Sequence, residues 1–294
     1  MTNSLEDFNE ILSPDESLAP WTWLKLGGPA ERFYQPTSRA QLIALVQCLA
    51  QSGISIKVLG GGSNLLVPDA GVSGAVIRVA DPLLSEISVD GNTIMAGGGA
   101  LLSAIVSESV RCQLAGLENL VGIPGTLGGA IKGNAGGRQG DIGDFVQTVE
   151  VLTASGDVAV RSGDELTFSY RKSSVADLVV LSATMELKPD DSDDLTSRLK
   201  KTWIMKRATQ PLGDQSAGCI FRNPRGLSAG ALIEQCGLKD LTVGGVRISD
   251  RHANFMVTSD GATSAEVESL IEKVQNAVFE KFGVNLEPEI QRWS

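Results

Sequence analysis

Two glycine-rich stretches, about 60 residues apart, constrain this chain more than any other feature of its sequence. The first, residues 60–66, directly follows the apolar run Ile54–Leu59, which is typical of a buried strand. The second covers residues 122–137. Glycine lets backbone N–H groups converge on an anion, because no Cβ stands in the way. The pair therefore predicts a dinucleotide lying between two loops, while tight packing of two chain segments is the alternative explanation of the same glycines.

Composition places the chain among ordinary globular proteins. Its 294 residues are 42% hydrophobic and 20% charged, which argues against general disorder and allows roughly two domains. No apolar run reaches the length of a membrane span, and the N-terminus lacks the basic and apolar segments of a secretory signal. Four cysteines without a CxxC pair indicate reduced thiols, and the single histidine, His252, argues against a His-based metal site. We therefore expect a cytoplasmic protein with no bound metal and no membrane contact.

Charge is distributed unevenly along the chain. The net charge is −10, which argues against a nucleic-acid-binding surface. Between Thr196 and His252, however, ten basic and four acidic residues leave a local charge of +6. A field of this kind favours binding of a small polyanion. A solvated basic face that balances the aspartates of residues 190–194 explains the same pattern, and charge alone does not decide between the two.

The periodicity of the apolar residues predicts an α+β fold. Ser38 caps a helix that Gly53 ends, and Thr263 with Glu266 forms a capping box before a late helix. The strongly apolar segment Leu178–Leu187 is typical of a central strand. Further strands are expected over residues 54–59, 74–79, 94–96, 146–154 and 158–161, and further helices over residues 101–114 and 195–208.

Proline and acidic residues mark the predicted boundaries. Residues 1–20 carry five acids and no base, and we expect them to form a flexible acidic lead-in. Pro189 and the aspartates that follow it separate a first domain, residues 21–190, from a second domain, residues 195–294.

Three more segments carry ionisable residues without indicating a reaction by themselves. They are Ser169-Tyr170-Arg171-Lys172-Ser173, Ser216-Ala217-Gly218-Cys219-Ile220-Phe221-Arg222-Asn223-Pro224 and Leu286-Glu287-Pro288-Glu289-Ile290. An arginine, a thiol and a glutamate from such distant segments can converge in an active site. A surface salt bridge and a core cysteine are the simpler interpretation of the same residues.

Taken in order, these segments resemble the UDP-N-acetylenolpyruvoylglucosamine reductases, the flavoenzymes of bacterial cell-wall precursor synthesis. The resemblance covers residues 22–292 and includes Leu26-Gly27-Gly28-Pro29-Ala30 and His252-Ala253-Asn254-Phe255. The lack of a long insert after Arg171 is similar to the shorter type of the family, which has no extra Tyr-bearing substrate loop. The order and spacing of the motifs, rather than any single one, make the resemblance specific.

The resemblance implies a fold and a reaction. The first domain would have the FAD-binding fold of the vanillyl-alcohol-oxidase type, built from two α+β subdomains, and the C-terminal α+β domain would bind the substrate. NADPH would reduce non-covalently bound FAD, and the flavin would pass hydride to C3 of the enolpyruvyl group of UDP-N-acetylglucosamine enolpyruvate. Protonation at C2 would complete UDP-N-acetylmuramate. The UDP-sugar and NADPH are the partners expected of such an oxidoreductase, which we expect to be a monomer.

The resemblance also implies roles for individual residues. Arg171 matches the position that stabilises charge on the substrate carboxylate, and Glu289, on a C-terminal strand that returns to the active site, matches its hydrogen-bonding partner. Cys219 matches the proton donor to C2, where the family more often has Ser. Glu287, two residues earlier, is the competitor of Glu289. The residues expected to contact the substrate are Tyr170, Arg222 and Asn223.

The FAD contacts are expected in the two glycine-rich stretches, where backbone N–H groups would hold the pyrophosphate. The predicted FAD-binding residues are Gly60, Gly61, Gly62, Ser63, Asn64, Leu65, Gly122, Ile123, Pro124, Gly125, Thr126, Gly128, Gly129, Asn134 and Ala135. For His252, a structural part is the favoured interpretation.

Two alternatives stand beside the reductase. One is another FAD-dependent oxidoreductase of the same fold, and the other is a flavin-binding paralogue that has lost catalysis. The Cys219 and Glu289 segments fit the reductase, and the replacement of Ser by Cys is the one feature that favours the paralogue.

Overall fold

The computed structural model describes residues 4–80, 82–137 and 139–294. The chain forms two compact units, each assembled from three stretches of sequence. The first unit contains the chain up to Asp15 together with Glu31–Gly61 and Ser73–Ile204, and the second contains Glu16–Ala30, Gly62–Val72 and Met205–Ser294. Helices and strands occur together in both units, as the α+β prediction requires.

A four-stranded sheet lies mainly in the first unit, with the strand order β1-β2-β5-β3. Its strands are β1 (Leu12–Ser17), β2 (Pro29–Tyr34), β3 (Ile56–Leu59) and β5 (Val72–Arg78). Helix α1 (Arg39–Gln51) begins after Ser38, whose side chain accepts a hydrogen bond from the amide of Gln41, so the predicted cap is confirmed. The buried face of α1, including Leu42 and Leu45, packs in one apolar cluster with Ile77 of β5.

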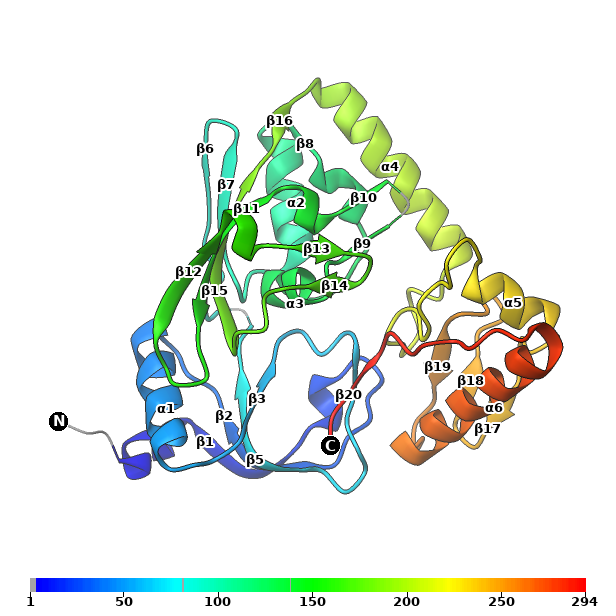
Figure 1. Cartoon of the computed structure of the whole chain (residues 1–294), viewed down its shortest axis with the longest axis horizontal. Coiled ribbons are helices and arrows are strands. Elements are labelled where there is room, and N and C mark those ends of the chain that lie inside the picture. Colours follow the sequence, from blue (N-terminus) through cyan, green and yellow to red (C-terminus); the bar gives the residue numbers. More distant parts are fainter. Residues whose placement is uncertain (1–3, 81, 138) are drawn as a thin grey trace. The chain divides into compact units, whose positions relative to one another are not determined.

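The first unit also contains a five-stranded antiparallel sheet, in the order β12-β11-β15-β7-β6 (Figure 1). Its strands are β6 (Ile87–Asp90), β7 (Thr93–Gly97), β11 (Val146–Leu152), β12 (Val158–Ser162) and β15 (Val179–Glu186). The predicted central strand, β15, is buried on both faces. Val180 packs with helices α2 (Leu102–Arg111) and α3 (Leu127–Lys132), while Leu181 belongs to the α1 cluster.

Short elements complete the first unit. The strand pairs are β8 (Leu114–Ala115) with β16 (Lys188–Pro189), β9 (Gly136–Gly137) with β10 (Gly140–Asp141), and β13 (Phe168–Ser169) with β14 (Lys172–Ser173). The 3₁₀ helices of this unit are η1 (Leu5–Ile11), η3 (Leu117–Leu120), η4 (Ile142–Asp144) and η5 (Gly163–Glu165).

The second unit is built around helix α6 (Ser264–Phe282). Thr263 and Glu266 form the predicted capping box, and Gly283, with a φ of 67°, ends the helix in the left-handed conformation. Leu24 and Leu66 are buried in the same core as α6, which explains why two early stretches of chain belong to this unit. The other elements are η2 (Ala19–Trp21), β4 (Leu65–Leu66), α5 (Ala229–Gln235), β17 (Thr242–Val243), β18 (Val246–Ile248), β19 (Met256–Thr258) and β20 (Gln291–Arg292).

The expected flexible lead-in differs from the structure. Leu5–Ile11 forms η1 with a capping box at Ser4, and Leu12–Ser17 is an edge strand of the first sheet. Phe8 and Leu18 are buried. Apolar side chains placed among the acids therefore anchor this segment, because burying them offsets the entropy lost on ordering.

The expected boundary near residues 190–195 also differs from the structure. Helix α4 (Ser192–Thr209) runs through it, and the two units divide at Ile204 and Met205. The aspartates start this helix, with Asp193 and Asp194 in its first turn. Carboxylates are favourable there because the N-terminal end of a helix carries partial positive charge, so the acidic run marks a helix start rather than a linker.

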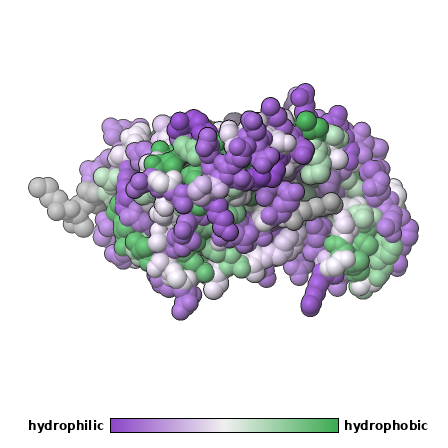
Figure 2. Space-filling model, turned by 90° about the horizontal axis from the view of Figure 1, so that it is seen from above, coloured by the Kyte–Doolittle hydropathy of each residue, from purple (hydrophilic) through white to green (hydrophobic). Residues whose placement is uncertain are grey.

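Hydrophilic residues cover most of the face drawn in Figure 2, and the apolar residues on that face form separate patches. Within the described residues, no helix combines the length and the apolar character needed to cross a membrane.

Candidate functional site

The start of the first glycine-rich stretch lies against the second stretch in the first unit. A Cβ added at Gly61 would lie 2.9 Å from the Cα of Gly125, and one added at Gly60 would lie 2.7 Å from the Oγ1 of Thr126. The first distance leaves no room for a side chain, and the second would require Thr126 to move. The close-packing interpretation of these glycines is therefore confirmed, and the packing sets the two loops side by side.

The amides of the second stretch fall into two groups. Those of Ile123, Leu127 and Gly128 donate to backbone carbonyl oxygens at 3.0, 2.9 and 2.8 Å, and these bonds fix the shape of the loop. The amides of Gly125 and Thr126, by contrast, have no acceptor within residues 4–80, 82–137 and 139–294. Unpaired amides in successive residues of a glycine loop are suited to a phosphate group. The residues present thus fit the pyrophosphate of a dinucleotide.

Arg171 lies in a two-residue turn between β13 and β14. Its φ is +56°, a left-handed conformation that costs a non-glycine residue on the order of 1 kcal/mol. The buried side chain of Asn134 supports the turn. Its Nδ2 donates to the carbonyl oxygen of Ser169 at 2.9 Å, and its Oδ1 accepts from the amide of Gly143 at 3.0 Å. These bonds give Asn134 a structural part, and its expected contact with FAD stays a prediction.

The guanidinium of Arg171 is held by the loop that follows α3. Nη2 donates to the carbonyl oxygen of Gly136 at 2.8 Å, and Nη1 lies 3.2 Å from Oδ1 of Asp141. The guanidinium carbon also lies 5.0 Å from the centroid of the exposed Tyr170 ring. The side chain of Arg171 is 17% exposed. The cation is therefore fixed in direction while part of it still faces solvent.

Cys219 begins a short extended segment in the second unit. Cys219 pairs with Phe255 in an isolated β-bridge, and the amide of Ile220 donates to the carbonyl oxygen of Asn254 at 2.9 Å. The Cys219 side chain is half-buried. One side of this segment is therefore attached to the His252-Ala253-Asn254-Phe255 motif.

The other side of the same segment lies along residues 287–289. The amide of Glu289 donates to the carbonyl oxygen of Ile220 at 2.6 Å, and the amide of Arg222 donates to that of Glu287 at 2.9 Å. Cys219 and Glu289 are thus on neighbouring segments, although 70 residues separate them in the sequence.

Glu289 and Glu287 differ in burial, although residues two apart share one face of a regular extended segment. The side chain of Glu287 is 75% exposed, whereas Glu289 is half-buried. Asn64, from the first glycine-rich stretch, lies beside this extended segment in the second unit. Its Nδ2 donates to the carbonyl oxygen of Glu289 at 3.3 Å, and its own carbonyl oxygen accepts from the amide of Gln291 at 3.1 Å. The pairing of β4 with β20 continues this contact.

Three buried side-chain atoms among the described residues have no hydrogen-bond partner. They are Asn64 Oδ1, Ser216 Oγ and Arg222 Nε. An unpaired buried polar atom costs about 1–3 kcal/mol, so each requires an explanation. All three belong to the second unit and to two of the motifs that carry the resemblance. This restriction to two short segments supports binding of a polar ligand there.

The basic region between Thr196 and His252 is partly neutralised by ion pairs. The pairs are Arg198 with Glu118 and Asp190, Lys239 with Glu234, and Arg247 with Asp240. These side chains behave as a solvated face. Arg222 differs, because its Nε is buried and its Nη1 reaches Glu287 Oε2 only at 3.7 Å. Asn223 accepts a hydrogen bond from the amide of Ala229 at 2.9 Å, at the start of α5.

His252 has a structural contact, as its favoured interpretation predicts. Its Nδ1 accepts a hydrogen bond from the amide of Asn254 at 3.2 Å, and its ring meets Phe255 edge-on at 4.8 Å. Burial lowers the pKa of His252 below its ordinary value of 6.5, and the Lys239 cation lowers it further, while Glu234 opposes the change.

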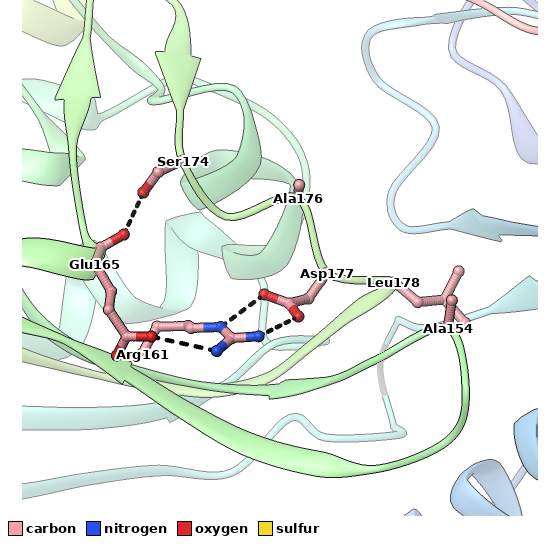
Figure 3. A pocket seen from close by; sticks show the side chains of 7 residues that line it. All are labelled: Ala154, Arg161, Glu165, Ser174, Ala176, Asp177 and Leu178. Carbon is pink, nitrogen blue, oxygen red and sulfur yellow. Dashed lines mark hydrogen bonds and ion pairs between the residues drawn. The ribbon is translucent and has the colours of Figure 1, made fainter.

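A surface pocket of the first unit contains none of the predicted site residues (Figure 3). The residues that line it are Ala154, Arg161, Glu165, Ser174, Ala176, Asp177 and Leu178. Arg161 donates two hydrogen bonds to Asp177, at 2.8 and 3.1 Å, and pairs with Glu165 at 3.3 Å. These hydrogen bonds hold the pKa of the Asp177 carboxyl below its usual range. Since the arginine faces two carboxylates, the pocket offers no unpaired cation to an anionic ligand.

Three residues at the site have features that the sequence did not predict. Asp141 contacts the Arg171 guanidinium, Ser216 has an unpaired buried hydroxyl, and Asn254 bonds to the Cys219 segment. Ser216 and Asn254 lie in two of the motifs that carry the resemblance, and this position is the sequence signal that could have indicated a part in the site. No spacing rule relates Asp141 to Arg171, because a loop brings them together.

Comparisons with known proteins identify relatives of both parts of the chain. A family model described as the C-terminal domain of UDP-N-acetylenolpyruvoylglucosamine reductase matches residues 210–293, and an FAD binding domain model matches residues 30–161. The reductase of Paramagnetospirillum magneticum is 38% identical over 96% of this chain and 91% of its own length. The reductase of Moorella thermoacetica is 39% identical over 95% and 92%. The crystal structure of the reductase from Thermus caldophilus is 36% identical, with a TM-score of 0.83 over 96% of this chain and 99% of that one.

Proposed function

Since the chain belongs to the UDP-N-acetylenolpyruvoylglucosamine reductase family, we propose that it reduces the enolpyruvyl group of UDP-N-acetylglucosamine enolpyruvate to UDP-N-acetylmuramate. It is a flavoprotein oxidoreductase with an FAD-binding fold of the vanillyl-alcohol-oxidase type. NADPH is its co-substrate in this proposal. The observation that carries the proposal is the adjacency of Cys219 and Glu289 on paired segments of the second unit.

When bound, FAD would supply the hydride transfer from NADPH to C3 of the enolpyruvyl group. In this chain the Gly60–Gly61 turn and the unpaired amides of Gly125 and Thr126 would hold the pyrophosphate. No histidine lies in either glycine-rich stretch, so we propose non-covalent binding.

Arg171 is proposed to stabilise the substrate carboxylate. Addition of hydride at C3 places negative charge on C2 and, by conjugation, on the carboxylate oxygens. A cation fixed beside those oxygens lowers the energy of the transition state more than that of the substrate. The bonds from Arg171 to Gly136 and Asp141 support this role, because they orient the guanidinium before substrate binds.

Cys219 is proposed to give the proton to C2, and Glu289 to donate a hydrogen bond to the substrate carboxylate. A thiol is much more acidic than the hydroxyl that is commoner at this position, so it can protonate an enolate carbon. The partial burial of both side chains supports these roles, since it limits competition from water. Arg222, with its unpaired buried Nε, is proposed to bind an anionic group of the UDP-sugar, and Asn223 and Tyr170 to line its path.

We propose that the protein acts as a monomer in the cytoplasm, without nucleic acid or membrane partners. Its partners would be the UDP-sugar and NADPH. Both are anionic and the net charge of the protein is −10, so local basic groups such as Arg222 would bind them.

One anaerobic titration tests the function. The purified protein should be yellow, lose its colour with NADPH and regain it when UDP-N-acetylglucosamine enolpyruvate is added. Colour that NADPH does not bleach would point to the flavin-binding paralogue. Bleaching that the UDP-sugar does not reverse would point to another oxidoreductase of the same fold.

A further inference from the structure

Asn254 holds the segment that carries Cys219. Its side chain is 3% exposed, and its amide group makes two hydrogen bonds to the backbone of Phe221. Oδ1 accepts from the amide of Phe221 at 3.0 Å, and Nδ2 donates to the carbonyl oxygen of Phe221 at 2.8 Å. A side-chain amide offers the same donor and acceptor as a peptide group. The side chain of Asn254 therefore pairs with Phe221 as the backbone of a residue in a neighbouring strand would.

Phe221 needs such a partner because it is only 1% exposed. Buried backbone N–H and C=O groups are costly when they are left unpaired. The chain opposite Phe221 cannot supply a regular backbone ladder, because residues 252–255 form a turn in which the amide of Phe255 donates to the carbonyl oxygen of His252 at 2.9 Å. The side chain of Asn254 makes the two hydrogen bonds that the backbone of this turn does not make.

Asn254 is itself held on both sides. Its amide donates to Nδ1 of His252 at 3.2 Å, and its carbonyl oxygen accepts from the amide of Ile220 at 2.9 Å. An acceptor at Nδ1 requires a neutral imidazole with its proton on Nε2. The only histidine of the chain thus acts as a fixed acceptor for the residue that fixes Phe221.

We propose that Asn254 is a positioning residue of the site. By fixing Phe221 it sets where Cys219, two residues earlier, and Asn223, two residues later, stand relative to Glu289. The opposite edge of the segment carries the bond from Glu289 to Ile220, so a shift of Phe221 disturbs both members of the Cys219–Glu289 pair. The inference rests on the proposed function, in which Cys219 gives the proton to C2.

Two variants test this role. Asn254→Leu has a similar size and removes both hydrogen bonds to Phe221, while Asn254→Asp keeps an acceptor for the amide and removes the donor to the carbonyl oxygen. Reoxidation of reduced flavin by substrate should slow by on the order of 100-fold in Asn254→Leu, the effect of misplacing a reacting group by about 1 Å. Asn254→Asp should fall between Asn254→Leu and the parent. Flavin reduction by NADPH should change much less in both.

Two further measurements need no turnover. The rate of alkylation at Cys219, resolved by mass spectrometry, should change in Asn254→Leu, while that at Cys236, a half-buried thiol of the same unit, should not. Hydrogen exchange at the amide of Phe221 should become faster. Ser264→Ala is the matched control, because it removes the partly buried hydrogen bond that Ser264 Oγ accepts from the amide of Asp69 in the same unit. It should lower the melting temperature and leave both half-reactions and the Cys219 rate at parent values.

Several results would overturn the positioning role. One is a parent-like reoxidation rate in Asn254→Leu with unchanged Cys219 alkylation. Another is equal slowing of both half-reactions, reproduced by Ser264→Ala at the same loss of stability, since that pattern belongs to a purely structural residue. If the parent itself is not reoxidised by the UDP-sugar, the proposed function fails instead. The alkylation and exchange rates then still decide whether Asn254 fixes the segment.

Discussion

The two units build their candidate ligand contacts in opposite ways. In the first unit, Gly60 and Gly61 approach Gly125 and Thr126 so closely that the contact depends on missing side chains. In the second unit, hydrogen bonds between distant stretches of chain hold Cys219 and Glu289 on paired extended segments, and buried polar atoms are left without partners. The first arrangement suits a cofactor that is bound through backbone amides, and the second suits a substrate on which individual side chains act.

The largest expected effect tests whether a side chain of the second unit, that of Cys219, takes part in the reaction. Cys219→Ala should still bind FAD and accept electrons from NADPH. Its reoxidation by substrate should be slower by about 10²–10⁴-fold, the usual contribution of a general acid. Stopped-flow absorbance of the flavin separates the two half-reactions.

Cys219→Ser is the control for that variant, because a hydroxyl keeps a proton donor at a similar reach. It should retain appreciable activity. Parent-like turnover by Cys219→Ala would mean that the thiol only packs and that the proton comes from elsewhere, with bound water as the first alternative.

A smaller effect is expected for the first unit, where the contact between the two loops depends on glycine. In Gly61→Ala the added Cβ would meet the Cα of Gly125 at 2.9 Å, so the loops must separate. Overpacking of this kind costs about 1–3 kcal/mol, which corresponds to roughly a 5- to 150-fold loss of FAD affinity if the loop contact forms the binding surface. Fluorescence titration of the apoprotein with FAD measures this loss.

Gly137→Ala is the matched control, because a Cβ at Gly137 meets nothing within 4 Å. It should bind FAD as the parent does. Unchanged FAD affinity in Gly61→Ala would show that the close contact of the two loops has no part in holding the cofactor.

The same contrast explains which features the sequence predicts. The sequence predicts helix starts correctly at Ser38 and at the Thr263–Glu266 capping box, because a cap acts within one helical turn. The central strand β15 was predicted from its continuous apolar run, which burial on both faces requires. Leu5–Ile11 was missed, because five surrounding acids concealed the contribution of one buried residue, Phe8.

Long-range contacts of the candidate site were harder to predict. The bonds from Asn254 to Phe221 join residues 33 positions apart, and the bond from Asn64 to Glu289 joins residues 225 apart. Such contacts follow from how strands pair in space and leave no periodic pattern in the sequence. The residues themselves lie in motifs that carry the resemblance, but only the folded chain shows which partners they bind.

A pH-dependent effect sharpens the role of His252 in the second unit. Burial lowers the pKa of folded His252 below 6.5, so the unfolded chain binds the proton more readily. The stabilising contribution of the neutral ring is complete above pH 6.5 and is lost as the pH falls through the folded pKa. Each unit of difference in pKa corresponds to about 1.4 kcal/mol. The groups that face this ring are Lys239 and Glu234.

His252→Gln tests this effect, since an amide oxygen can accept a hydrogen bond but does not titrate in this range. Thermal unfolding at pH 7.5 and pH 5.0 should show a larger loss of stability in the parent than in the variant. Carboxyl groups with lowered pKa values, such as Asp177, act at lower pH, because their ordinary value is 3.8. Identical pH profiles for the two proteins would rule out a contribution from His252.

The smallest expected effect concerns Glu287, which differs from Glu289 by its exposure. Its carboxylate lies 3.7 Å from Arg222 and is open to solvent, and exposed ion pairs contribute roughly 0–1 kcal/mol. Glu287→Gln should therefore leave both half-reactions and the melting temperature nearly unchanged. It also removes the carboxylate that competes with an anionic ligand for Arg222, so the KM for the UDP-sugar should stay constant or fall slightly, most visibly at low ionic strength. Glu289→Gln, measured beside it, should slow reoxidation by substrate. A large loss of turnover in Glu287→Gln with a mild one in Glu289→Gln would reverse the assignment of the two carboxylates.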